Sequence, residues 1–178
     1  TGVRTTWPLG GRDEEVAHVG AFVRRGRGVL LAGPSGVGKT SLASLVGGDL
    51  ESAGWTVVRV VASRTAAAIP FGALAPLLSP GAALADGAPA LMQARAGIAS
   101  LADGGPSLVV VDDAQWLDEA SAILLHQLVA QRDVTLLVTS RTDEPAPEPV
   151  TALWKDGLVD RIDVSPLDDV SVRNLLES

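Results

Sequence analysis

One short run of residues constrains the fold of this chain more than any other feature. The run from Gly33 to Thr40 reads G-P-S-G-V-G-K-T and satisfies the pattern G-x-x-x-x-G-K-[ST]. The apolar residues 28–32 before it predict a buried strand, and residues 40–46 after it predict the start of a helix. A strand, a glycine-rich loop and a helix N-terminus together form a cradle for phosphate groups. The residues expected to bind a phosphate-bearing cofactor are Pro34, Ser35, Gly36, Val37, Gly38, Lys39, Thr40 and Ser41.

Lys39 and Thr40 give this loop its expected chemistry. A lysine at this position reaches the β- and γ-phosphates of a nucleotide, and the threonine hydroxyl binds Mg²⁺. The alternative is a tight turn from strand to helix that merely needs glycine. Lys39 argues against that alternative, because a positive charge at a helix N-terminus opposes the helix dipole unless an anion is present. The loop therefore predicts a site for a nucleotide with Mg²⁺.

Composition bounds the class of protein. A chain of 178 residues fits one domain, 1–178, with enough length for a real core. It is 47% hydrophobic but only 3% aromatic, so the core consists of Val, Leu and Ala, which suits buried parallel strands. The chain has no cysteine, which excludes disulfides and thiolate metal sites. Its net charge of −7 argues against nucleic-acid binding by this segment itself.

Two segments bear on membranes and on domain organisation. Residues 65–85 carry no charged side chain, but Pro70, Pro76 and Pro80 interrupt them, so we expect a loop-and-helix insertion rather than a membrane span. No signal peptide is evident, and we expect a cytoplasmic chain with no membrane partner. Residues 168–178 begin an amphipathic helix that stops without a cap. We therefore expect this chain to be a fragment of a longer protein.

Strands and helices alternate along the predicted chain. This order favours a parallel α/β sheet with right-handed crossovers. Residues 142–149 are rich in Pro and Glu and predict a loop. The helix over 118–132 is expected to begin with Asp118 as its N-cap. The other predicted helices cover 12–25, 39–53 and 88–103, and the predicted strands cover 29–32, 56–62, 107–111, 134–139 and 160–164.

A pair of acids follows the apolar strand 108–111. Because the carboxyl ends of parallel strands face the ligand in open α/β sheets, Asp112 and Asp113 are expected at the phosphate-binding edge. Asp112 is the expected partner of Mg²⁺, and Asp113 is expected to orient or deprotonate an attacking water. The alternative is that two acids simply end a strand in a turn. The phosphate-binding loop upstream favours the functional interpretation, because each motif needs the other.

Arg141 follows the strand 134–139 and is expected at the same edge. An arginine there can contact the γ-phosphate and detect its loss. The alternative is an exposed arginine paired with Asp143 or Glu144, which contributes little. Trp116, which follows the acids, is expected to pack beside the site.

Taken together, these motifs resemble a known family. The chain is similar to the nucleotide-binding domain of STAND-class P-loop ATPases, and most similar to that of the large ATP-binding LuxR-type (MalT-like) transcriptional regulators. The resemblance covers nearly the whole chain, and its most specific part is the run D-D-x-Q-W-x-D from Asp112 to Asp118. The matching segments are Gly11–Glu15, Gly33–Thr40, Ile69–Leu78, Val110–Ser121, Thr139–Arg141 and Ser165–Leu167.

The resemblance implies a fold and a role. The fold is a three-layer α/β/α sandwich with a mostly parallel five-stranded sheet in the order 5-1-4-3-2. The role is a nucleotide switch, in which ADP holds an inactive form and ATP permits self-association. The expected partners of this chain include the C-terminal domains of the same regulator. One of them is a helix-turn-helix domain outside this chain, to which DNA binding belongs. Gly11 and Arg12 are expected near the adenine and ribose.

The resemblance also implies weak ATPase activity. Lys39, Asp113 and Arg141 are then the catalytic residues, and Thr40 and Asp112 hold the metal. The wider AAA+ relatives carry Glu where this chain has Asp113, so we expect slow hydrolysis. Two alternatives stay open: a STAND module of another signalling protein, or a P-loop small-molecule kinase. A GTPase is disfavoured, because the sequence has no Asn-Lys-x-Asp run.

Overall fold

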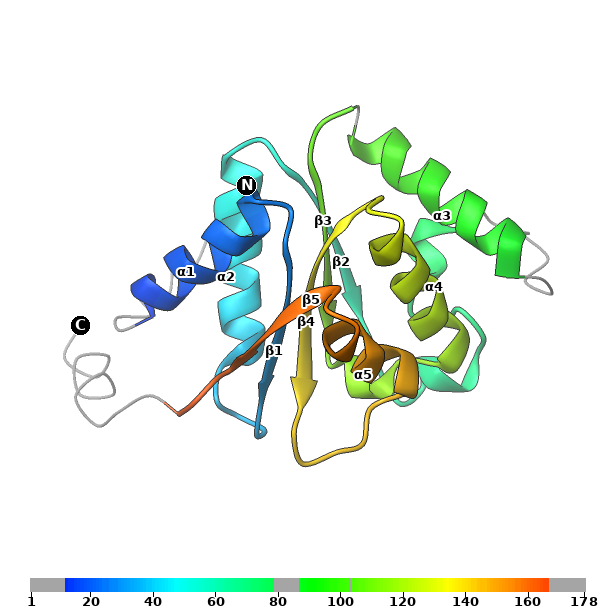
Figure 1. The fold of residues 1–178 in the computed structure, drawn as a ribbon. Coiled ribbons are helices and arrows are strands. Elements are labelled where there is room, and N and C mark those ends of the chain that lie inside the picture. The colour runs from blue at the N-terminus through cyan, green and yellow to red at the C-terminus, as the bar shows by residue number, and fades with distance from the viewer. Residues whose placement is uncertain (1–11, 79–86, 103, 167–178) are drawn as a thin grey trace, which may run out of the picture.

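The computed structural model describes residues 12–78, 87–102 and 104–166. Within them, five parallel strands form one sheet in the order β2-β3-β4-β1-β5. Read from the other edge, this is the expected order 5-1-4-3-2, so the expectation is confirmed. The strands run in parallel down Figure 1, with their carboxyl ends at the bottom. Their bounds are β1 Gly28–Gly33, β2 Thr56–Val61, β3 Ser107–Asp112, β4 Thr135–Arg141 and β5 Val159–Asp163.

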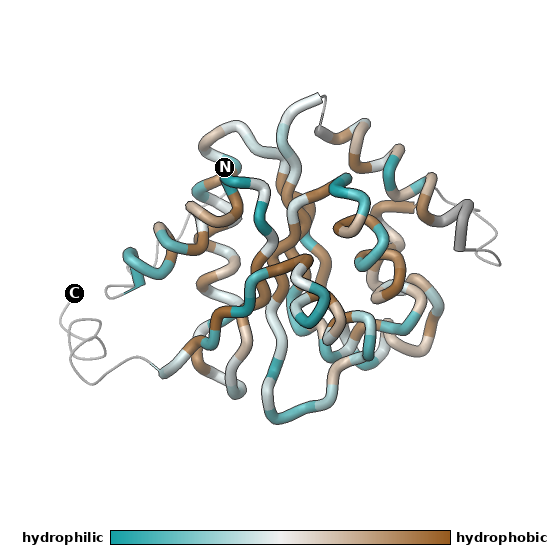
Figure 2. The backbone as a smooth tube through the Cα atoms, viewed as in Figure 1, coloured by the Kyte–Doolittle hydropathy of each residue, from teal (hydrophilic) through white to brown (hydrophobic). Residues whose placement is uncertain are grey.

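The central strands form where the sequence is apolar on both faces. Every residue of β1 is buried, and its side chains divide between two cores. Val29 and Leu31 belong to the cluster beneath α1 and α2, whereas Leu30 belongs to the cluster beneath α3, α4 and α5. Figure 2 shows this hydrophobic centre running along the middle of the sheet. Burial on both faces explains why these strands read as continuous apolar runs rather than as alternating patterns.

Among the residues described, five α-helices cover the two faces of the sheet. Figure 1 shows α1 and α2 on one face and α3, α4 and α5 on the other, which confirms the three-layer α/β/α architecture. Their bounds are α1 Asp13–Arg24, α2 Lys39–Ser52, α3 Gly87–Ala102, α4 Glu119–Ala130 and α5 Glu148–Lys155. No helix among the described residues is both long enough and apolar enough to cross a membrane.

Helix α5 corrects the sequence analysis, which assigned residues 142–149 to a loop and no helix to the residues after them. Prolines at 145, 147 and 149 indicated a loop, but proline is tolerated in the first turn of a helix, where no backbone donor is needed. Val150 and Leu153 are buried and fix the helix to the core. With only eight residues, α5 gives too short a periodic signal to be recognised from sequence.

The insertion after β2 also differs from its expected form. Over the described residues it consists of two 3₁₀ turns, η1 Ala66–Ala68 and η2 Ala75–Leu77. A side chain at Gly72 would place a Cβ 2.5 Å from the Ala66 carbonyl oxygen, so this close backbone approach requires glycine. The remainder of the insertion, the predicted helix 168–178 and Gly11 lie outside the described residues.

Asp118 is the N-cap of α4, as predicted. Its Oδ1 accepts hydrogen bonds from the backbone amides of Ser121, at 2.8 Å, and Phe71, at 2.9 Å. Its Oδ2 accepts from the Ser121 hydroxyl at 2.6 Å. The carboxylate therefore closes the first turn of α4 and attaches the insertion to it.

Candidate nucleotide-binding site

The carboxyl ends of β1, β3 and β4 meet at one edge of the sheet. The register aligns Gly33, where the phosphate-binding loop begins, with Arg141 on β4. It aligns Val111, which precedes the two acids, with Val138 on the same strand. The topology therefore brings together three segments that lie far apart in sequence, at the edge where open α/β sheets bind ligands.

Glycine shapes the loop between β1 and α2. Gly36 and Gly38 have φ values of 80° and 92°, in the left-handed region that other residues rarely adopt. A Cβ at Gly33 would lie 2.6 Å from the Val164 carbonyl oxygen, so the chain also needs glycine at the end of β1. Helix α2 begins at Lys39, and the first amides of a helix have no partner within it. These amides and the positive end of the helix dipole favour an anion.

The Lys39 side chain is folded back along this loop. The residue is only 6% exposed, and its Nζ donates to the carbonyl oxygens of Gly33 at 3.0 Å and Pro34 at 2.7 Å. Burial lowers the pKa of Lys39 below its usual value of 10.5, and the nearby carboxylate of Asp113 opposes that shift. The loop thus holds a partly desolvated cation, whose charged form a bound phosphate would stabilise.

Thr40 and Asp112 lie together at the expected metal position. The Thr40 hydroxyl donates to Asp112 Oδ1 at 2.9 Å, although the two residues are 72 positions apart in sequence. The described residues contain no cluster of three or more His, Asp or Glu side chains that could hold a metal on its own. Mg²⁺ commonly takes one or two protein oxygens and completes its shell with phosphate oxygens and water. One hydroxyl and one carboxylate fit that requirement.

Thr139 is a site residue that had no predicted role, although it begins the segment Thr139–Arg141 that matches the family. It is fully buried, and its hydroxyl donates to Asp112 Oδ1 at 2.5 Å. The Thr139 hydroxyl oxygen in turn accepts from the Asp113 backbone amide at 2.9 Å. Thr139 therefore fixes both acids from the neighbouring strand. Threonine is common in strands, so its type alone gave no signal. Its place two residues before Arg141, on a strand that ends at the same edge, was the available clue.

Gln115 links Asp113 to Arg141. Asp113 has a φ of 56°, a left-handed conformation that is uncommon outside glycine. The buried Gln115 amide donates from Nε2 to Asp113 Oδ1 at 2.9 Å, and its Oε1 accepts from the Arg141 backbone amide at 3.1 Å. The Arg141 Nε lies 3.4 Å from Asp113 Oδ1. The second acid is therefore held by an amide and by a guanidinium.

Arg141 also takes part in a polar cluster around Trp116. Its Nη1 donates to Glu144 at 3.0 Å, so the pairing weighed as an alternative is present. Its guanidinium lies over the Trp116 ring, 4.6 Å from the centroid, and Arg64 lies over that ring at 5.3 Å. The Trp116 Nε1 donates to Glu144 at 2.9 Å, and this hydrogen bond is the main reason that the pKa of Glu144 lies below its usual 4.5. Trp116 thus packs against two arginines at the edge of the site.

Arg12 lies against the loop rather than in open solvent. The residue is 2% exposed, and its Nη2 donates to the carbonyl oxygens of Val37 at 2.6 Å and Ser165 at 3.1 Å. Its Nη1 donates to Glu15 at 2.6 Å. These contacts place Arg12 next to the phosphate-binding loop. Contact of Arg12 with the adenine or ribose stays a prediction.

Comparison with known proteins identifies the family. A family model described as the AAA ATPase domain matches residues 8–139, about three quarters of the chain. Among solved structures, DnaA from Aquifex aeolicus bound to AMPPCP superposes with a TM-score of 0.60 at 16% identity, covering 94% of this chain and 52% of that one. Drosophila ORC bound to AT-rich DNA and Cdc6 gives 0.58 at 17% identity, covering 93% and 63%.

These solved structures share the fold, and this chain spans only part of the length of each. No curated protein matches the sequence. The family match, which covers well over half of the chain, includes the loop and both acids. The chain therefore belongs to the AAA ATPase domain family and is a nucleotide-binding module with the P-loop fold.

Proposed function

We propose that the chain is the ATP-binding, slowly ATP-hydrolysing switch module of a LuxR-type STAND regulator. The observation that carries the nucleotide site is the 2.9 Å hydrogen bond between the Thr40 hydroxyl and Asp112 Oδ1. This contact joins the end of the phosphate-binding loop to the acid at the end of β3. The two groups that a P-loop site uses on Mg²⁺ are therefore preassembled.

In this proposal the loop binds and neutralises the phosphates. The amides at the start of α2 and the Lys39 ammonium take the β- and γ-phosphates, and Lys39 exchanges its carbonyl partners for phosphate oxygens. Thr40 and Asp112 hold Mg²⁺, which neutralises charge on the phosphate oxygens when it is bound. Thr139 keeps Asp112 oriented, because its buried hydroxyl donates to the same carboxylate.

Asp113 and Arg141 complete the proposed hydrolytic function. Asp113 orients the attacking water or accepts its proton, and Arg141 contacts the γ-phosphate. One feature favours slow turnover: the aspartate side chain is one methylene shorter than glutamate. The contacts of Asp113 Oδ1 with the Gln115 amide and the Arg141 guanidinium orient the carboxylate for its role.

The switch is proposed to act through the cluster around Trp116. Arg141 cannot hold both Glu144 and a γ-phosphate with the same donors, so ATP and ADP would leave this cluster in different states. In the regulator, ADP would hold the inactive form and ATP would permit self-association. DNA binding is assigned to a helix-turn-helix domain outside this chain, in keeping with its net charge of −7.

Titration calorimetry with ATP, ADP and GTP, each with Mg²⁺, tests the nucleotide site. We expect binding of adenine nucleotides that Lys39→Ala abolishes while its circular dichroism stays unchanged, because the substitution removes a phosphate contact rather than core. Lys155→Ala, at the chain's other lysine, is the matched control and should bind as the wild type does. Equal binding by Lys39→Ala, or a preference for GTP, would refute the proposed site.

Sedimentation in the presence of Mg·ATP or Mg·ADP tests the switch. The proposal expects tighter binding of ADP than ATP and a larger assembly with ATP alone. Identical sedimentation with both nucleotides, at saturating concentrations, contradicts nucleotide-dependent self-association.

A further inference from the structure

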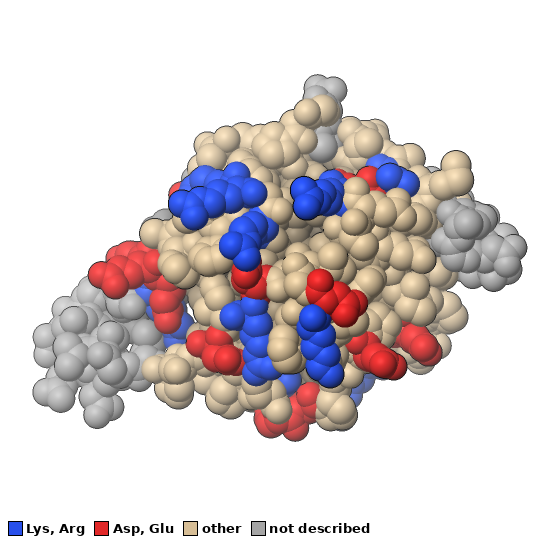
Figure 3. All heavy atoms as spheres, in the orientation of Figure 1, with Lys and Arg blue, Asp and Glu red and all other residues tan. Residues whose placement is uncertain are grey.

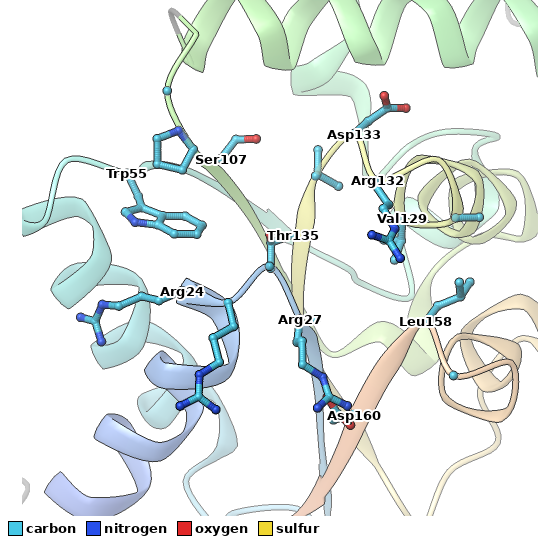
Figure 4. Close-up of a pocket in the computed structure, with 18 residues that line it drawn as sticks. Arg24, Arg27, Trp55, Ser107, Val129, Arg132, Asp133, Thr135, Leu158 and Asp160 are labelled. Atoms are coloured by element: carbon cyan, nitrogen blue, oxygen red, sulfur yellow. Dashed lines mark hydrogen bonds and ion pairs between the residues drawn. The ribbon is translucent and has the colours of Figure 1, made fainter.

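A cavity of about 830 Å³ lies at the edge of the sheet opposite the phosphate-binding loop. Its walls come from the turn between α1 and β1, from the residues before β2 and β3, from the turn between α4 and β4, and from the start of β5. Figure 4 shows Arg24, Arg27, Trp55, Arg132 and Asp160 arranged around this hollow. Its volume lies within the range of small-molecule sites, which run from about 300 to about 1,000 Å³.

The charged residues that line this cavity are four arginines and two aspartates, Asp133 and Asp160. Arg24 pairs with Asp49 at 2.5 Å, and Arg27 pairs with Asp160 at 2.6 Å. The cavity is also lined by two more arginines, Arg25 and Arg132. Across the part of the chain that the structure describes, neither has a carboxylate within 4.0 Å.

This grouping contrasts with the rest of the molecule. Figure 3 shows basic side chains in the upper part of this face, over the region where α1 ends and β4 begins, and others lower down, where acidic side chains lie next to them. The chain as a whole carries a net charge of −7, so a local excess of cations is not a consequence of composition. Unpaired guanidinium groups around one hollow repel one another, and a bound anion would relieve that repulsion. Their planar donor arrays match phosphate and carboxylate oxygens.

The other lining groups distinguish between kinds of anion. Ser107 and Thr135, at the amino ends of β3 and β4, contribute hydroxyl groups that can donate to phosphate oxygens. The Trp55 indole lies at one side and extends toward the hollow, where it offers a flat apolar surface. Gly26, with a φ of 73° and no atom within 4 Å of a built Cβ, leaves the mouth open between the arginines.

We propose that this cavity is a second ligand site, for a phosphate monoester that carries a flat ring, a mononucleotide being the chemical class. The arginines and hydroxyls take the phosphate, and Trp55 packs against the ring. The proposal does not depend on the proposed function, because it involves none of the residues of the phosphate-binding loop. A nucleoside monophosphate has no β- or γ-phosphate for Lys39 to contact, so this ligand differs from the one proposed for the phosphate-binding loop.

Calorimetry with AMP tests the site, in the wild type with saturating Mg·ADP and in Lys39→Ala without it. We expect saturable binding of AMP in both, weakened about tenfold or more by Arg25→Gln combined with Arg132→Asn. Asparagine is chosen for position 132 because Arg132 has a φ of 58°, which asparagine tolerates. The control is Arg161→Gln, which removes one exposed guanidinium, paired with Asp163, from outside the cavity.

The ring contact has its own readout. Trp55→Phe should weaken AMP binding and leave the affinity for inorganic phosphate unchanged. Equal affinity of AMP and inorganic phosphate in the wild type would overturn the assignment of a ring-bearing ligand.

Three further results would overturn the site. They are no AMP binding, an equal loss in Arg161→Gln, or displacement of AMP by Mg·ADP from the wild type. Binding of an acidic peptide such as oligo-glutamate, in place of AMP, would assign the cavity to a protein partner instead. Mg·ADP binding is measured on the same variants and reports on the phosphate-binding loop alone. If it persists in the variant with Arg25→Gln and Arg132→Asn, or fails in every variant, that result bears on the proposed function and not on the second site.

Discussion

Replacing Thr139 with valine tests whether one buried hydroxyl organises the acidic side of the site. Valine preserves the shape and the β-branching but removes the oxygen that bonds both Asp112 and the Asp113 amide. A hydrogen bond to a charged group contributes about 1.5–3 kcal/mol and a neutral one about 1 kcal/mol. Because water can reach part of the Asp112 carboxylate, we take the lower half of that range. Thr139→Val should therefore lower the free energy of unfolding by about 2.5–3 kcal/mol.

Urea and thermal unfolding measure this loss. For a chain of this length it corresponds to a fall in Tm of roughly 5–10 °C. Thr135→Val is the matched control, because it makes the same change on the same strand at a residue that is less buried and has no such bonds. The Thr139 variant should also bind Mg·ADP more weakly, since Asp112 is no longer oriented. A loss no larger than that of the control would refute the role assigned to this hydroxyl.

Three further predictions follow from the polar contacts. Gln115→Leu should lower kcat for ATP hydrolysis about tenfold at unchanged nucleotide Kd, because the amide no longer fixes Asp113; unchanged steady-state kinetics would contradict this. Because the pKa of Glu144 lies below 4.5, its contacts stabilise the fold above pH 4.5 and are lost as the pH falls through the lowered pKa. Trp116, which donates to Glu144, should therefore change its fluorescence only below pH 4.5. Burial lowers the pKa of Lys39, because the charged form loses hydration in the folded protein. This cost to the stability of the fold is fully present at pH values below the lowered pKa, where Lys39 is charged in the folded protein. It disappears above pH 10.5, where Lys39 is neutral in the folded and the unfolded chain. Nucleotide binding in the alkaline range below 10.5 should therefore take up a proton, which calorimetry in two buffers of different ionisation enthalpy detects as a buffer-dependent heat.

The parallel sheet could be predicted from sequence because its determinants are local. The strands around Leu30, Val110 and Leu137 are apolar on both faces. Gly36 and Gly38, placed between a strand and a helix, indicate a loop with left-handed backbone conformations. The order of the strands came from the resemblance, since periodicity identifies strands but not their neighbours. Helix α5 was missed because three prolines mask a short amphipathic turn.

The polar contacts of the site were harder to predict from the sequence than the strands were. Nothing in the types of Thr139 and Gln115 marks them as partners of the two acids, because their bonds depend on the register between β3 and β4. The same limit applies to Glu144, whose contact with Trp116 crosses from one loop to another. Sequence motifs identify groups that touch a ligand, whereas the residues that hold those groups become visible only when strands are aligned.

The buried guanidinium of Arg12 connects two parts of the backbone through hydrogen bonds. One nitrogen, Nη2, donates both to Val37 in the phosphate-binding loop and to Ser165 beyond β5. These carbonyl groups lie 128 positions apart along the chain, and one guanidinium nitrogen joins them. A displacement of the backbone at Ser165 would therefore strain the same side chain that holds the peptide before Gly38. The phosphate-binding loop and the chain that leaves the sheet are linked through a single buried arginine.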